Sequence, residues 1–109
     1  MTTTYKNARL AVTTSNAAIY TCPGATKTIV KNCQVANVSG STTCWVTASW
    51  TDASSGSAVT RLVNEIDIKI NTAIDVLSGT LVLEGGDVLK LDAEIDSILE
   101  ATASILEIT

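Results

Sequence analysis

The sequence contains no histidine, and this absence removes the most common catalytic base. Without histidine, neither a Ser-His-Asp triad nor a Cys-His pair can form, and no Ser-x-x-Lys motif offers a substitute base. The lack of histidine and of any Cys-x-x-Cys pair also argues against a zinc site. We therefore predict that the chain is not an enzyme and that it needs no cofactor.

Aromatic residues are also scarce, at 4% of the chain, and phenylalanine is absent. The core must therefore consist mainly of Ile, Val, Leu and Ala. Threonine and serine are abundant, and threonine suits a half-exposed pleated surface because its β-branched side chain is stiff. This composition favours strands before any pattern is considered.

The chain carries a net charge of −4, and its seven basic residues form no cluster. A nucleic-acid-binding domain needs a basic stripe to displace counterions from phosphates, and an anionic membrane surface attracts basic clusters in the same way. No apolar run approaches the roughly 20 residues that span a bilayer. We expect neither nucleic acid nor a membrane as a partner.

The first residues, Met1–Asn7, lack the charged start and the apolar stretch of a signal peptide. We therefore expect the protein to be made and folded in a cytoplasm. Its cysteines, Cys22, Cys33 and Cys44, are odd in number, whereas a secreted disulfide scaffold usually has an even set. We predict free thiols that pack as small hydrophobic side chains.

Short alternating runs of apolar and polar residues recur along the chain, separated by polar turns at intervals of roughly 8–12 residues. The pattern predicts a single antiparallel all-β domain over residues 1–109, a β-sandwich or jelly roll of about eight to ten short strands, with residues 1–4 as a loose arm. The main predicted strands are 8–13, 17–21, 27–38, 44–51, 58–63, 66–70 and a last strand beginning near 99.

The clearest local pattern is Leu81–Ala93, which predicts two short strands joined by a Gly-Gly-Asp turn. After it we predict a turn at Glu94–Ser97, with a short helix as the alternative because Ile95, Ile98 and Leu99 also have helical spacing. At the C-terminus, Leu106 and Ile108 reverse the alternation and predict a bulge or a tail packed on another surface. Lys31 interrupts an apolar face, which predicts a strand end, an edge or a bulge.

Two carboxylate pairs, Glu84 with Asp87 and Asp92 with Glu94, are predicted to form a solvated acidic face. They offer too few oxygen ligands for calcium. Trp45 is the main candidate contact residue, because alternation places it on a polar face opposite Trp50 and it could anchor another protein. A covering loop or arm is the alternative. Tyr5 and Tyr20 are weaker contact candidates.

Several stretches together form a recognisable pattern. They are Tyr5-Lys-Asn-Ala-Arg-Leu10, Ala18-Ile-Tyr-Thr-Cys-Pro23, Thr28-Ile-Val-Lys-Asn32, Gln34-Val-Ala-Asn37, Trp45–Asp52, Leu81–Leu91 and Ser104–Ile108. With them, nearly the whole chain resembles small virion structural proteins of tailed bacteriophages, of the capsid cement or decoration type.

This resemblance implies a small β-sandwich on the outer surface of the virion capsid, assembled in the host cytoplasm. It implies the major capsid protein as the partner and self-association as a dimer or trimer, and it carries no catalytic residues. Two alternatives stay open: a tail or baseplate accessory module, and a carbohydrate-binding module with Trp45 as its stacking surface.

Overall fold

The computed structural model describes residues 1–109, which form nine strands and one short 3-10 helix. The elements are β1 (Thr3–Val12), β2 (Ala17–Thr21), β3 (Lys27–Asn37), β4 (Cys44–Asp52), η1 (Ala53–Ser55), β5 (Ala58–Ile68), β6 (Ala73–Asp75), β7 (Leu81–Leu83), β8 (Val88–Ala93) and β9 (Leu99–Ile108). All strand pairs are antiparallel. The predicted all-β sandwich is confirmed. No helix in the structure is long and apolar enough to cross a membrane.

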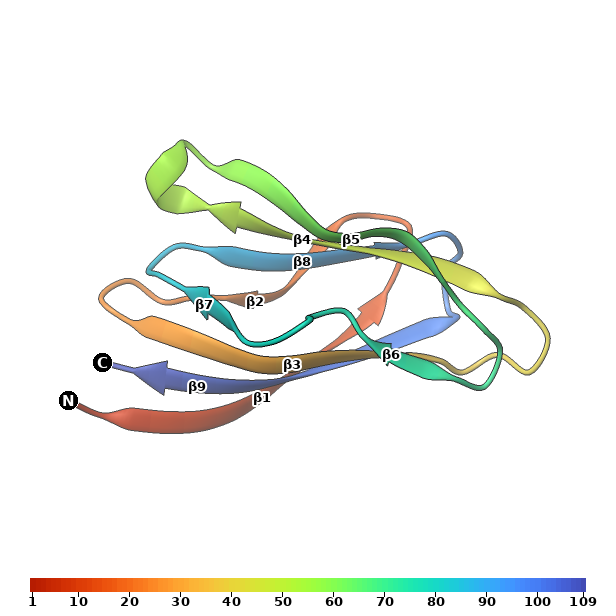
Figure 1. The fold of residues 1–109 in the computed structure, drawn as a ribbon, viewed down its shortest axis with the longest axis horizontal. Helices are drawn as coiled ribbons and strands as arrows, with labels where there is room; N and C mark the ends of the chain where they lie inside the picture. The colour runs from red at the N-terminus through yellow and green to blue at the C-terminus, as the bar shows by residue number, and fades with distance from the viewer.

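The strands form two facing sheets (Figure 1). One has the order β1-β9-β3-β6, with β7 also paired to β3, and the other has the order β2-β8-β4-β5. The chain folds back on itself as one long ribbon, in which β4 pairs with β5, β3 with β6 and β7, β2 with β8, and β1 with β9. A ribbon rolled into two sheets in this way is a jelly roll.

The core lies between the two sheets and consists of 20 buried apolar residues. Aliphatic side chains dominate it, as the composition predicts, and Leu83, Leu89 and Leu91 are among its largest members. Tyr20 and Trp50 are partly buried and pack against it. The three cysteines are buried in it as free thiols. Burial, together with the nearby negative charge of Asp75, raises the pKa of the Cys33 thiol to about 12. The cysteines therefore act as small core residues.

The stretch Leu81–Ala93 does not form the predicted hairpin. Its first arm, β7, pairs with β3 in one sheet, and its second arm, β8, pairs with β2 and β4 in the other. The turn between them is an arch that crosses from sheet to sheet. Alternation is the same in a hairpin and in an arch, since both bury one face of each arm, so the sequence pattern cannot distinguish them.

Asp87 holds this arch in place from a buried position, so the predicted solvated acidic face is wrong for this residue. Its carboxylate accepts hydrogen bonds from the Ala53 N–H at 2.9 Å and the Glu84 N–H at 2.9 Å. Its carbonyl accepts from the Cys22 N–H at 2.8 Å. Asp87 therefore joins three separate loops, and its burial follows because backbone donors replace the lost water.

The predicted loose arm over residues 1–4 is wrong from Thr3 onward, because β1 begins there and pairs with β9 along its full length. Thr2 and Thr109 also exchange backbone hydrogen bonds of 3.1 and 2.9 Å. The first residues of β1 are polar because they lie in an edge strand that is largely exposed. Their apolar signal is therefore too weak to reveal a strand.

The predicted strands 58–63 and 66–70 are one strand, β5, which ends at Ile68. Of the three alternating isoleucines, only Ile68 is buried, whereas Ile66 is 42% and Ile70 is 40% exposed. Ile70 lies in the turn after β5, and Ile66 is exposed because β5 is an edge strand. Only one side of it is covered by a neighbour, so inward-pointing positions can still meet solvent.

The C-terminal third follows the preferred prediction, with bends and turns over residues 94–98 and no helix. In β9 the buried residues are Leu99, Ala101, Ala103 and Ile105. The prediction of a bulge or a separately packed tail at Leu106 is wrong, because β9 stays in register with β1 through Ile108 and Glu107 takes the next inward position. A bulge does occur at Lys31, where the register of β3 against β9 shifts between Val30 and Asn32. This confirms the bulge, one of the three structures predicted at Lys31.

Candidate functional site

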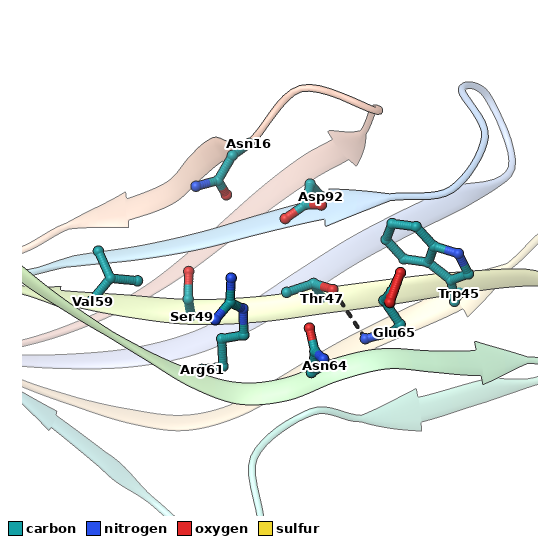
Figure 2. A pocket seen from close by; sticks show the side chains of 9 residues that line it. All are labelled: Asn16, Trp45, Thr47, Ser49, Val59, Arg61, Asn64, Glu65 and Asp92. Atoms are coloured by element: carbon teal, nitrogen blue, oxygen red, sulfur yellow. Dashed lines mark hydrogen bonds between the residues drawn. The ribbon is translucent and has the colours of Figure 1, made fainter.

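An open groove of about 520 Å³ lies on the outer face of the β2-β8-β4-β5 sheet (Figure 2). Most of its lining residues are polar, and they come from β4, β5, β8 and the turn before β2. They are Asn16, Trp45, Thr47, Ser49, Val59, Arg61, Asn64, Glu65 and Asp92. We call this feature the polar groove.

Strand alternation explains part of the polar groove. On β4, Cys44, Val46 and Ala48 point into the core, so Trp45, Thr47 and Ser49 point outward. This agrees with the face predicted for Trp45. Its side chain is half-buried and forms one end of the groove.

A bulge in β5 explains why consecutive residues both face the groove. Val46 pairs with Ile66 and Ala48 pairs with Val63, so Thr47 alone lies opposite both Asn64 and Glu65. Glu65 has a left-handed backbone with φ 51°, and its N–H donates to the Thr47 hydroxyl at 3.0 Å. In a regular strand, Asn64 and Glu65 would point to opposite faces.

The charges in the polar groove are mixed, with Arg61 against Asp92 and Glu65. Burial raises the pKa of the Asp92 carboxyl above its usual range, although the positive charge of Arg61 opposes this and the negative charge of Glu65 supports it. The groove carries one more acid than base. It offers hydrogen-bond donors, acceptors and one aromatic surface, which together suit a polar ligand.

Sequence reasoning singled out Trp45 but missed Asn16, Arg61, Asn64 and Glu65. A local signal was present: the run Leu62-Val63-Asn64-Glu65-Ile66 breaks strict alternation with two apolar and then two polar residues. Such a break is what a bulge produces. The predicted pair Asp92 and Glu94 has two different surroundings: Asp92 lines the groove, and the Glu94 carboxylate accepts from the backbone N–H of Trp45 at 3.4 Å. No group of three acidic, histidine or cysteine side chains is placed to hold a metal ion.

A second feature crosses the outer face of the other sheet. Tyr5 on β1 pairs with Leu106 on β9, Leu106 pairs with Ile29 on β3, and Ile29 pairs with Val82 on β7. These four residues form a continuous row across four strands, which we call the apolar row. Tyr5 is 77% and Val82 57% exposed, and the two central residues are half-buried.

The third aromatic candidate, Tyr20, has an internal role. Its hydroxyl group donates to the Glu107 carboxylate and lies 2.8 Å from the Thr28 hydroxyl. Burial and the hydrogen bond to Glu107 raise the pKa of Tyr20 above its ordinary value. Glu107 also forms an ion pair with Lys6 at 3.2 Å. Tyr20 thus belongs to a hydrogen-bond network between the sheets rather than to an open surface.

No protein-family model and no curated protein sequence matches this chain. A solved structure of the T13 IBDV viral particle contains a similar fold, with a TM-score of 0.58 over 96% of this chain at 5% identity. Two structures of a pentameric capsid protein from metagenomic phage sequences each give a TM-score of 0.48 over 91% of this chain at 16% identity. The chain spans 30% of the first protein and about 60% of the second. At these identities, the likeness concerns the fold alone.

Proposed function

We propose that this chain is a non-enzymatic structural protein of a bacteriophage virion, specifically a capsid cement protein. It binds the outer surface of the shell, bridges subunits of the major capsid protein and is assembled in the host cytoplasm. The observation that carries this proposal is the apolar row on the β1-β9-β3-β7 face. Tyr5, one of the predicted contact residues, lies at its exposed end.

The apolar row has the properties of a contact surface. Tyr5 and Val82 are both well exposed at its two ends, and an apolar patch bordered by polar residues is typical of protein interaction sites. Lys27 and Lys31 flank Ile29 on the same strand and are exposed. The complementary partner surface is therefore an apolar strip bordered by carboxylates.

The fold supports the same proposal by analogy. Jelly rolls occur in viral capsid domains, and the structural likeness to a protein of the T13 IBDV particle covers nearly the whole chain. The sequence resemblance to phage cement proteins points in the same direction. Because one fold can serve many functions, the exposed apolar row is the feature that distinguishes a contact role for this chain.

Self-association is part of this proposal. A shell presents many identical sites, so a dimer or trimer of the chain would bind several neighbouring subunits at once and gain avidity from modest single contacts. The mass of the purified protein in solution tests this directly. A monomer at all concentrations would contradict the dimer or trimer, although not the binding to the shell.

The first test is quantitative proteomics on purified particles of the phage that encodes the chain. We expect a copy number that matches the number of symmetry-related sites on the shell. Absence from the particles would reject the proposal, and a few copies confined to isolated tails would support a tail or baseplate module instead.

The second test uses variants of the apolar row. Tyr5→Ser and Val82→Ser should each weaken binding to particles that lack the protein by about tenfold or more, because each removes exposed apolar area from one end of the contact. Val59→Ser is the matched control, since Val59 is 60% exposed on the opposite sheet. Equal binding by all three variants would contradict the proposed surface.

A further inference from the structure

The polar groove lies on the sheet opposite the apolar row, and the proposed shell contact leaves it free. We propose that the polar groove is a binding site for a neutral saccharide, with Trp45 as the stacking surface and the surrounding polar side chains as hydrogen-bond partners. This inference goes beyond the cement role and does not depend on it.

The chemistry of the polar groove matches that of a sugar ring. A pyranose has a face of C–H groups and a rim of hydroxyl groups, so it needs both an apolar plane and many hydrogen-bond partners. Trp45 supplies the plane at one end of the groove (Figure 2). Asp92 can accept two hydrogen bonds and Arg61 can donate two, and both planar groups suit neighbouring hydroxyls.

The charge of the polar groove selects against other ligands. Two carboxylates, on Asp92 and Glu65, stand against the single guanidinium of Arg61, so a phosphate, a sulfated sugar or a sialylated sugar would meet a net negative surface. A peptide strand would require a free sheet edge or an apolar pocket. The groove instead lies on a sheet face, where only Trp45 and Val59 are apolar.

The polar groove is also preformed. The Thr47 hydroxyl holds the Glu65 N–H at 3.0 Å, and Thr47 and Ser49 form a buried floor. Glu65 is the one residue inside a strand whose φ is positive without being glycine, and such strained positions cluster at functional sites. The volume of about 520 Å³ lies within the roughly 300–1,000 Å³ usual for small-ligand sites.

The test starts from the purified full chain on an array of neutral, sialylated and sulfated oligosaccharides. We expect binding to neutral glycans only. The strongest neutral oligosaccharide is then titrated into the labelled protein, and NMR should show shifts of the Trp45 indole N–H and of the backbone N–H of Asn64 and Glu65. A blank array, or a preference for sialylated or sulfated glycans, would overturn the inference.

Variants then assign the site. Trp45→Ala should weaken binding of that oligosaccharide by at least about tenfold, because it removes both the stacked ring and its apolar area, whereas Trp45→Tyr should retain most of it. Asn64→Ala should also weaken binding. Because Asn64 is exposed, this variant should still fold, and its affinity tests the site if Trp45→Ala unfolds. Unchanged affinity in both alanine variants would overturn the inference.

Tyr5→Ser separates this inference from the proposed function. Tyr5 lies on the opposite sheet, so the variant should lose binding to particles but keep full affinity for the oligosaccharide. If the wild type and Tyr5→Ser bind the saccharide equally well but neither binds particles, the cement role is contradicted and the saccharide site is supported.

Discussion

At the scale of single residues, the most informative side chain is Glu107. It takes an inward position on β9 and is only 7% exposed, although its neighbours Leu106 and Ile108 point outward. The hydrogen bond from Tyr20 lowers the pKa of the Glu107 carboxyl, burial opposes this, and Lys6 adds to the lowering. In the sequence, a glutamate among apolar residues predicts a bulge. In the structure, the hydrogen bond from Tyr20 and the ion pair with Lys6 allow Glu107 to point inward.

This lowered pKa makes stability depend on pH. Because the folded carboxyl binds a proton less readily than the unfolded one, its contribution is complete above the ordinary glutamate pKa of 4.5 and is lost as the pH falls through the folded pKa. We expect Glu107→Gln to lower the free energy of unfolding at pH 7 by about 1 kcal/mol, the difference between a charge-assisted and a neutral hydrogen bond.

Urea unfolding followed by circular dichroism between pH 7 and pH 3 checks this expectation. The gap between the wild type and Glu107→Gln should close as the pH falls. Glu100→Gln, an exposed position on the same strand, is the control and should track the wild type. A constant gap at every pH would show that the charge on Glu107 contributes nothing.

At the scale of elements, the sequence was sufficient for most strands and insufficient for their partners. Alternation located β2, β3, β4 and β9 closely, because it reports directly which residues leave water. It could not place β7 and β8 in opposite sheets, since pairing is decided by distant chain segments. For the same reason it found Trp45 but not the side chains from β5 and β8 that surround it.

The bulge in β5 gives a prediction about two threonines on β4. The Thr47 hydroxyl accepts from Glu65, whereas the Thr51 hydroxyl is buried without a partner. We expect Thr47→Val to lower the free energy of unfolding by about 1 kcal/mol, because one hydrogen bond is lost. Thr51→Val should be neutral or slightly stabilising, since it removes an unsatisfied polar group. Urea unfolding at pH 7 compares them, and equal effects would contradict this account of the bulge.

At the scale of the whole molecule, the rolled ribbon places the two ends of the chain side by side at one end of the sandwich (Figure 1). The turn from β4 to β5 is the tip of the ribbon. A circular permutant can be made by joining Thr109 to Met1 with a short glycine-serine linker and opening the chain between Gly56 and Ser57. Its new termini would lie between β4 and β5, and the linker between β9 and β1 would become the closed end of the ribbon. Every strand pair of the jelly roll would be retained.

We therefore expect this circular permutant to fold cooperatively, with a free energy of unfolding within roughly 1 kcal/mol of the wild type, since loop closure depends only weakly on loop length. The matched control has the same linker but opens between Gly86 and Asp87. That cut introduces a charged terminus where Asp87 is 2% exposed and disrupts its hydrogen bonds with Cys22 and Glu84. Circular dichroism and urea unfolding distinguish the two chains. If the first permutant fails while the control folds, the β4–β5 tip, and not the buried arch at Asp87, holds the roll together.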